Sequence, residues 1–285
     1  MKKMFAIVLA ALMVAAMLAG CGSSTAETKA PETTATPAPA TEAAAPAETE
    51  APAETEAAAA FTTIEAGKLI MSTNAAFPPY EMVADDGSFE GIDVEIAGAV
   101  AAKLGLELVI DDMDFDAALL AVQQGKSDIV MAGVTVNEDR KMVMNFSDTY
   151  AVGVQVVIVK EGSDVTLDNL ADQMIGTQRG TTGYIYASGD YGEDHVTAYD
   201  NGASAVQALA NGQVDCVIID SAPAKAFVAA NPGLTILDTE YTVEDYAIGM
   251  NKDNTALLEA VNGALKELAE DGTIDSIVAK YISAE

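Results

Sequence analysis

The segment GKSDIVMAG at residues 125–133 has a counterpart 87 residues later, GQVDCVIID at residues 212–220. In both copies a glycine ends a predicted helix, and an aspartate precedes an apolar run that is typical of a buried strand. The repeat predicts that one helix–glycine–strand unit occurs in each of two lobes. A chance resemblance between two such corners is the alternative interpretation.

Strands and helices alternate on both sides of this repeat. Apolar runs predict strands at residues 68–73, 106–110, 128–131, 153–160, 174–177 and 214–219. Helical spacing predicts helices at residues 92–104, 116–124, 182–188, 203–211 and 222–230, and a helical C-terminus from residue 255. Such alternation indicates an α/β fold with open, mostly parallel sheets, and we expect two of them.

Arg140 is one of two arginines in a chain with 44 aspartates and glutamates. A guanidinium offers two parallel donors to one carboxylate, although a surface arginine paired with Glu138 or Asp139 is the alternative. Gly133 and Asp220 occupy equivalent carboxyl ends of the repeated strands, where open α/β sheets bind ligands. Arg140 in one lobe and Asp220 in the other would complement a zwitterion, which indicates an α-amino acid.

The N-terminus indicates export. Lys2 and Lys3 precede an apolar run at residues 4–18, which is too short to cross a bilayer of about 30 Å as a helix. We therefore predict a cleaved signal peptide at residues 1–20. LAGC at residues 18–21 resembles the lipobox of bacterial lipoproteins, in which Cys21 is acylated; an ordinary signal with an incidental cysteine is the alternative. A lipid on Cys21 would anchor the protein to the outer face of the cytoplasmic membrane.

A low-complexity segment separates this signal from the rest of the chain. Residues 22–60 are almost wholly Ala, Thr, Pro, Glu and Ser, which cannot bury a core, so residues 21–60 are predicted to be a lipidated tether. Globular composition begins at residue 61. We expect lobe 1 at residues 61–150 and 250–285, lobe 2 at residues 155–244, and a hinge at residues 150–154 and 245–249.

Charge and cysteine content exclude several classes of function. A net charge of −30 excludes nucleic acid as a partner, because phosphate binding needs a basic surface. Cys216 is predicted to be a buried, inert thiol that forms no disulfide. One histidine, His195, and one free cysteine cannot supply a usual zinc site, so we expect no metal and no cofactor. We expect a monomer.

Ordered motifs carry a family resemblance. They are FPPYE at 77–81, GIDVE at 91–95, MDF at 113–115, residues 133–140, NFSDTY at 145–150, GTQRGTT at 176–182 and residues 215–220. Over residues 64–283 the chain resembles the extracellular solute-binding proteins (family 3) of polar amino acid ABC importers. The resemblance implies a type II periplasmic-binding-protein-like fold, in which a two-strand hinge joins two α/β lobes around a ligand cleft. The implied partners are a membrane permease and its ATPase.

The resemblance also implies a ligand site. Arg140 would bind the α-carboxylate, together with backbone N–H groups of Thr181 and Thr182, although Thr182 is equally a helix N-cap candidate. The residues implied for the α-ammonium are Asp220, the Gly133 carbonyl and the Thr135 hydroxyl. The aromatic residues implied around the ligand stem are Phe77, Phe115 and, nearby, Tyr80; core packing is the alternative for each.

The sequence leaves the substrate open. Relatives that bind cationic amino acids place an acid where Asn74 stands, so the neutral Asn74 argues against lysine or arginine. Gln178 and Arg179 approach the side-chain end, where amides would suit glutamine or cystine. An inward Arg179 would instead favour aspartate or glutamate, and a solvated position beside the cleft is the alternative for this residue.

Two other classes of protein compete with this interpretation. The first is an enzyme, because the predicted two-lobed fold resembles that of secreted cyclohexadienyl dehydratases. However, we identify no catalytic residue in the chain: His195 is expected at the surface, and no Gly-x-Ser-x-Gly motif occurs. A sensory ligand-binding module would need a signalling segment after the lobes. We therefore expect a binding protein and not an enzyme.

Overall fold

The computed structural model describes residues 61–238 and 240–282. The predicted signal peptide, Cys21 and the tether lie outside the described residues. Within the described part of the chain, no helix is both long and apolar enough to cross a membrane.

Nine strands form one mixed sheet. Their order is β5 (Glu107–Asp112), β1 (Lys68–Thr73), β6 (Ile129–Val130), β12 (Thr242–Asn251), β7 (Met144–Lys160), β10 (Cys216–Asp220), β8 (Ile175–Gln178) and β9 (Val196–Tyr199), with β11 (Leu234–Ile236) also paired to β7. A second, small sheet contains β2 (Ala76–Phe77), β3 (Glu81–Val83) and β4 (Phe89–Glu90).

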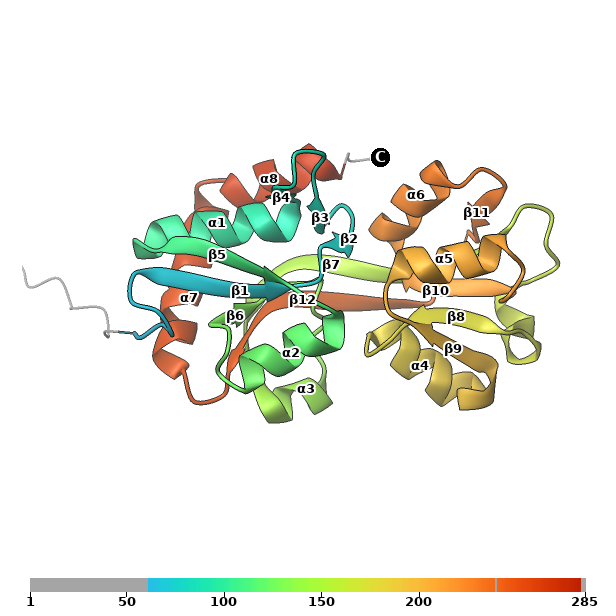
Figure 1. The fold of residues 1–285 in the computed structure, drawn as a ribbon, viewed down its shortest axis with the longest axis horizontal. Helices are drawn as coiled ribbons and strands as arrows, with labels where there is room; N and C mark the ends of the chain where they lie inside the picture. Colours follow the sequence, from blue (N-terminus) through green and yellow to red (C-terminus); the bar gives the residue numbers. More distant parts are fainter. Residues whose placement is uncertain (1–60, 239, 283–285) are drawn as a thin grey trace, which may run out of the picture. The chain divides into compact units, whose positions relative to one another are not determined.

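The expectation of two separate, mostly parallel sheets is wrong. Strand β7 is 17 residues long and pairs antiparallel with β12 from Gln155–Thr242 to Met144–Asn251, so the two strands join both lobes (Figure 1). The outer pairs β1–β5, β1–β6, β8–β10 and β8–β9 are parallel, as alternation predicts. The predicted strand at residues 153–160 is only the second half of β7, because its polar first half lacks an apolar run.

Helices cover the sheet in both lobes. The helices beside β1, β5 and β6 are α1 (Ile92–Leu104), α2 (Phe115–Gln123), α3 (Glu138–Val143), α7 (Thr255–Glu270) and α8 (Thr273–Tyr281). The helices beside β8, β9 and β10 are α4 (Thr182–Tyr191), α5 (Gly202–Ala210) and α6 (Ser221–Ala230). Short 3₁₀ helices span Leu167–Asp172 and Glu193–His195.

The sequence repeat has the same structure in both lobes. Gly125 and Gly212 follow helices α2 and α5 with φ of 66° and 72°, which glycine adopts without strain. The repeated aspartates then bind the neighbouring strand: Asp128 accepts from the Ile70 N–H, and Asp215 accepts from the Met174 N–H, both at 2.8 Å. The aspartate of the repeat therefore fixes the start of each following strand.

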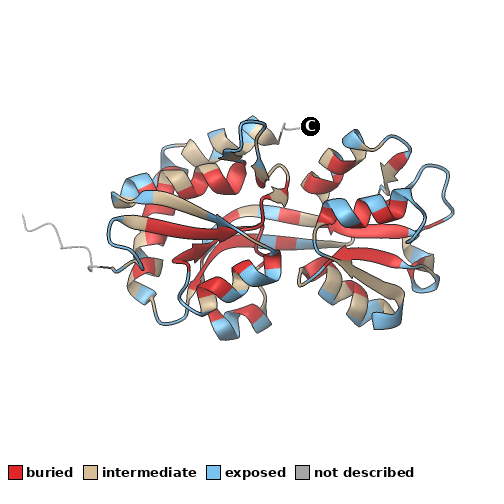
Figure 2. Ribbon diagram, viewed as in Figure 1, coloured by how far each residue is buried: buried red, intermediate tan, exposed pale blue. Residues whose placement is uncertain are grey.

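The sheet is the centre of the buried region (Figure 2). All five residues of β10 are buried, including Cys216. Burial raises the pKa of the Cys216 thiol to about 12, with Asp215 adding to the shift. The prediction that Cys216 is a buried free thiol is therefore confirmed, and the raised pKa disfavours the reactive thiolate.

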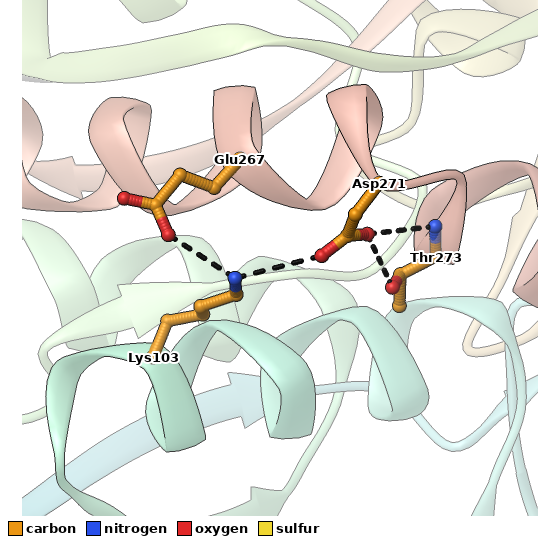
Figure 3. A network of polar contacts seen from close by, with 4 residues as sticks. All are labelled: Lys103, Glu267, Asp271 and Thr273. Carbon is orange, nitrogen blue, oxygen red and sulfur yellow. Dashed lines mark hydrogen bonds and ion pairs between the residues drawn. The ribbon is translucent and has the colours of Figure 1, made fainter.

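A polar network joins three helices on the surface of lobe 1 (Figure 3). Lys103 of α1 lies 3.1 Å from Glu267 and 3.5 Å from Asp271 at the end of α7, and Asp271 accepts from the Thr273 N–H at the start of α8. These charges are solvent-exposed, so screening limits their contribution to stability. Their role is to orient α7 and α8 against α1.

Candidate functional site

A cavity lies where residues of both lobes meet. Its lining residues are Asn74, Phe77, Glu81, Phe115, Ala132, Gly133, Thr135, Arg140, Gln155, Gln178, Thr181, Thr182 and Tyr246. The volume open to the centre of a water-sized sphere is about 20 Å³, which is enough for about one water molecule. An amino acid therefore enters this cavity only when its walls separate.

Arg140 is buried at this cavity and is not a surface residue. It lies in the short helix α3, which the Asn137 side chain caps by accepting from the Arg140 N–H at 2.8 Å. The guanidinium donates from Nη1 to the Thr135 carbonyl at 2.8 Å and lies 5.4 Å from the Phe115 ring centroid. Glu138, a local partner expected for a surface arginine, pairs with Lys141 instead.

The Arg140 charge has no ion-pair partner among the described residues. No carboxylate of the described chain lies within 4.0 Å of the guanidinium. Burial lowers the pKa of Arg140, and the nearby charge of Glu244 opposes the shift. Because arginine stays protonated in proteins, a buried guanidinium without an ion-pair partner is strongly stabilised when an anion binds to it.

Four hydrogen-bonded contacts of the described residues cross between the lobes around the cavity, one of which joins the Thr135 hydroxyl to Glu244. Arg140 Nη2 donates to the Gly180 carbonyl at 3.2 Å, and Gln178 Nε2 donates to Asn74 Oδ1 at 2.9 Å. The hydroxyls of Thr135 and Thr182 lie 3.3 Å apart. The same side chains thus line the cavity and hold its walls together.

Gly180 allows the walls to approach closely. Its φ is 73°, in the left-handed region that favours glycine. A Cβ at this position would lie 1.7 Å from Asp116 Oδ1 of the facing lobe. Both its conformation and its contact therefore require glycine.

The N-terminus of α4 faces the cavity. Thr181 is the N-cap of this helix and accepts from the Tyr184 N–H at 3.4 Å, so the N-cap alternative for Thr182 is wrong by one residue. Thr182 is the first helical residue and is buried. Its N–H lies in the first turn, where no intrahelical acceptor exists and the helix dipole favours an anion.

The aromatic predictions divide into two groups. Phe77 and Phe115 line the cavity. Tyr80 does not; it packs behind Phe77, with ring centroids 5.9 Å apart, and edge-on to Tyr246 at 5.3 Å. Burial raises the pKa of Tyr80, as expected for a core tyrosine. Tyr80 is therefore a core residue, which was the alternative to a place at the ligand.

Asp220 is fully buried but is not among the cavity-lining residues. Its Oδ1 accepts from the Ala222 N–H as the N-cap of α6, and its Oδ2 accepts from the Val154 N–H, both at 2.9 Å. Burial raises the pKa of Asp220 to about 6, while these N–H bonds and the Tyr246 hydroxyl oppose the shift. Its carboxylate therefore holds β7 and α6 together beside the cavity.

Two other charged or titratable candidates lie outside the cavity. Arg179 is more than half exposed and pairs with Asp200 at 2.9 Å, so it does not point inward. His195 lies at the end of a 3₁₀ helix, with Nδ1 3.3 Å from the Gln173 carbonyl oxygen. Among the described residues, no group of three His, Cys, Asp or Glu side chains is placed to hold a metal.

Glu81 is a cavity residue that the sequence analysis missed. It is 1% exposed, and its carboxyl group hydrogen-bonds to Asp93 but to no other described group. Burial, followed by the adjacent charge of Asp93, raises the pKa of Glu81 well above its ordinary value. Glu81 belongs to the FPPYE motif, which placed it near the expected site. The motif alone does not show that its side chain points into the cavity.

A buried polar cluster from the long strands was also missed. Glu244 of β12 accepts from Gln155 Nε2 of β7 at 2.9 Å and from the Thr135 hydroxyl at 3.1 Å. Gln155 and Tyr246 line the cavity. Gln155 and Glu244 were expected in lobe 2 and Tyr246 in the hinge, and none was expected in the site, because strands that pass between lobes lack the apolar runs of core strands.

Comparisons with known proteins agree with this geometry. A "Probable histidine-binding protein" of Neisseria gonorrhoeae is 33% identical over 222 residues, covering 75% of this chain and 83% of the relative. The "L-cystine-binding protein TcyJ" of Escherichia coli is 28% identical over 225 residues, covering 78% and 85%. Both are named for binding an amino acid and not for catalysis.

Solved structures show the same fold. An ancestral arginine-binding protein bound to glutamine matches with a TM-score of 0.73 and 38% identity, covering 76% of this chain and 99% of that one. The family model of the bacterial extracellular solute-binding proteins, family 3, matches residues 69–284, which is most of the chain and includes both lobes. This protein therefore belongs to the bacterial extracellular solute-binding proteins, family 3.

Proposed function

We propose that the protein captures a polar α-amino acid between its lobes and delivers it to the permease of an ABC importer. The observation that carries the proposal is Arg140, which is buried at a two-lobed cavity without an ion-pair partner among the described residues. Relatives named for histidine and for cystine support the amino acid class. The Arg140 guanidinium binds the α-carboxylate, a charge-assisted contact that strengthens when water is excluded.

The other predicted residues complete this site. Backbone N–H groups of Thr181 and Thr182 supplement Arg140 at the carboxylate, because both residues line the cavity at the N-terminus of α4. The Gly133 carbonyl and the Thr135 hydroxyl accept from the α-ammonium. Asp220 contributes through its negative field, since backbone N–H groups already bind both of its oxygens.

Phe77 and Phe115 pack on opposite sides of the ligand stem. Each is buried, and each lines the cavity with part of its ring. Apolar faces of this kind suit the methylene groups next to the α-carbon, whichever polar group ends the side chain.

Opening and closing of the cavity follow from the two long strands. We propose lobe 1 at residues 61–150 and 250–285, lobe 2 at residues 155–244, and a hinge at residues 150–154 and 245–249. The β7–β12 register shifts between Tyr246 and Gly249, and such irregularities weaken a ladder and localise bending. A ligand that contacts both lobes favours the closed form, which a permease then recognises.

Ligand binding tests the proposal directly. The purified protein is titrated by calorimetry with the twenty amino acids and cystine, and its melting temperature is followed with each. We expect at least one polar amino acid to bind and to raise the melting temperature, because a ligand of the native state stabilises it by mass action. The proposal fails if no member of this panel binds.

We further propose that Cys21 carries a lipid that anchors the protein to the outer face of the cell membrane. The support is the LAGC sequence after an apolar signal, in a chain whose family is extracellular. Cys21→Ser should move the protein from the membrane fraction to the soluble extracytoplasmic fraction, with unchanged ligand binding. A Cys21→Ser protein that stays with the membrane would contradict lipidation at this residue.

A further inference from the structure

We propose that the cavity selects an amino acid with a cationic, donor-rich side chain, and that Glu81 supplies this selectivity. The inference rests on the proposed amino-acid-binding function and names the substrate class within it. It is carried by the unpaired oxygens of the cavity and by the balance of buried charge around it.

The unpaired polar side-chain atoms of the cavity are all acceptors. Apart from the carboxyl contact between Glu81 and Asp93, the buried side-chain atoms without a hydrogen-bond partner among the described residues that line it are Glu81 Oε1, Glu81 Oε2, Gln155 Oε1 and Gln178 Oε1. Glu244 Oε1, beside Gln155, is a further unpaired acceptor. Buried acceptors are costly unless they receive hydrogen bonds, so the cavity favours a ligand that brings several N–H groups.

Chemistry fixes the orientation of both glutamine amides. Gln155 Nε2 faces the Glu244 carboxylate, which accepts only, so the Gln155 oxygen must lie on the other side. Asn74 Nδ2 donates to the Met113 carbonyl, which leaves Asn74 Oδ1 to accept from Gln178 Nε2. A flip of either glutamine amide would place two acceptor oxygens against each other.

Among the described residues around the cavity, buried carboxyl groups outnumber buried cations. Glu81, Asp93, Asp220 and Glu244 are buried carboxyl groups in this region, against the single buried cation Arg140. The α-groups of an amino acid add no net charge, whereas an acidic side chain adds another negative charge to a region of low dielectric. Aspartate and glutamate are therefore disfavoured, and a cationic side chain is favoured.

The neutral candidate ligands, glutamine and cystine, match the hydrogen-bond acceptors of the cavity less well than a cationic amino acid does. A glutamine side chain brings a carbonyl oxygen together with its two N–H donors, and that oxygen would lie among unpaired acceptors. A guanidinium brings only donors, five of them, in a planar fork. Cystine brings a second carboxylate along with its second ammonium group.

Glu81 is the carboxyl group that lines the cavity itself. It begins β3, and the groups that face it are Asp93 of α1, Tyr150 of β7, Tyr80 and Asp112. Asp93 is held in place by the Gly133 N–H at 2.9 Å; it hydrogen-bonds to Glu81, and its negative charge helps raise the pKa of Glu81. A ligand cation beside Glu81 would favour the charged form of this carboxyl pair, which gives the site a reason to prefer positive charge.

The neutral residue Asn74 does not argue against a cationic ligand in this geometry. Its side chain is engaged by Met113 and Gln178, and it serves to hold the lobes together. The negative charge stands at Glu81 instead.

Arginine and citrulline provide the test, because citrulline replaces the guanidinium with a neutral group of the same shape. We compare their dissociation constants for the purified protein, its Glu81→Gln variant and an exposed control, Glu90→Gln, on the neighbouring strand β4. The wild type and the control should bind arginine roughly tenfold or more tighter than citrulline, the range expected for a charged hydrogen bond. Glu81→Gln should bring that ratio close to one, with citrulline affinity little changed.

Glutamine at position 81 keeps the shape of a protonated glutamate and still donates to Asp93. If Glu81 only shares a proton with Asp93, the arginine-to-citrulline ratio will survive in Glu81→Gln, and its role in selectivity is overturned. If the Glu81→Gln variant does not fold, the ratio of arginine to citrulline affinity in the wild type still decides the substrate class. Equal binding of arginine and citrulline, or a preference for glutamate, glutamine or cystine, overturns the cationic class. If the protein binds a neutral or acidic amino acid and Arg140→Ala abolishes that binding, only the present inference is overturned. If no amino acid binds at all, the proposed function is overturned.

Discussion

Arg140 and Gly180 meet across the two lobes, where the guanidinium Nη2 donates to the glycine carbonyl oxygen at 3.2 Å. The residue proposed to bind the ligand is therefore also a residue that closes the cleft. A carboxylate bound as proposed would fix the guanidinium in place, and the fixed guanidinium would hold the second lobe. Ligand capture and closure would then share one side chain, which would link affinity to conformation.

Replacing Arg140 by alanine should weaken ligand binding by about 2–5 kcal/mol, because the ligand carboxylate is left buried without its partner. Calorimetry with the best ligand of the amino acid panel measures the loss. Arg179→Ala removes the same charge from an exposed position paired with Asp200, and its affinity should stay within a factor of about two, as for surface pairs. Near-native affinity in Arg140→Ala would remove Arg140 from the site.

Gly180→Ala should hinder closure. The new methyl group would clash with Asp116, and φ of 73° would be strained. We expect affinity to fall roughly tenfold or more, since each 1.4 kcal/mol of lost closure energy is a factor of ten. X-ray scattering with saturating ligand should show a larger radius of gyration than for the closed wild type. Gly189→Ala in the same helix α4, where a Cβ meets nothing within 4 Å, is the control and should bind normally.

The bond between Asn74 and Gln178 should couple the lobes during ligand binding. Alanine at either position removes the 2.9 Å hydrogen bond, and a double-mutant cycle on ligand affinity isolates its energy. We expect a coupling energy of about 0.5–1.5 kcal/mol, the usual net value of such a bond. Strict additivity of the two substitutions would mean that the bond does not form in the ligand-bound protein.

Some parts of this site could be predicted from sequence because local chemistry determines them. The rarity of arginine and its place after an apolar strand pointed to Arg140, and the repeated Gly–x–x–Asp corner gave the matching strands of both lobes. The start of the helix after Gly180 follows the same logic, since a left-handed glycine is a property of a short segment, although the N-cap is Thr181, one residue before the candidate Thr182.

Other parts depend on contacts between distant residues. Sequence places Asp220 at the end of a strand, but it does not show that the Val154 and Ala222 N–H groups occupy both carboxylate oxygens. The direction of Arg179 was left open and Glu81 was missed for the same reason: Asp200 keeps the arginine outside the cavity, whereas packing of β3 turns the glutamate into it. Which way a charged side chain points is set by tertiary packing.

The buried carboxyl Asp93 should make the protein less stable as pH rises. Burial raises its pKa in the folded chain to about 6 from an ordinary 3.8, although the Gly133 N–H bond opposes the shift. Between these two pKa values the folded state binds more protons than the unfolded state, so the free energy of unfolding falls as pH increases through this window. For a shift of this size, the loss between pH 5 and pH 7.5 is roughly 1–2 kcal/mol from Asp93, and Asp220 adds a similar amount.

Urea unfolding at pH 5 and pH 7.5 measures this loss, and 0.5 M salt separates it from surface repulsion in a chain of net charge −30. Salt screens exposed charges and leaves buried ones largely unscreened, so the pH dependence should persist in salt. Asp93→Asn keeps an oxygen that accepts from the Gly133 N–H but cannot titrate, and should therefore flatten the dependence by the Asp93 share. Asp85→Asn, in an exposed turn, should leave it unchanged. A dependence that vanishes in salt, or that Asp93→Asn does not reduce, would assign it to the surface charges instead of to the buried carboxyl.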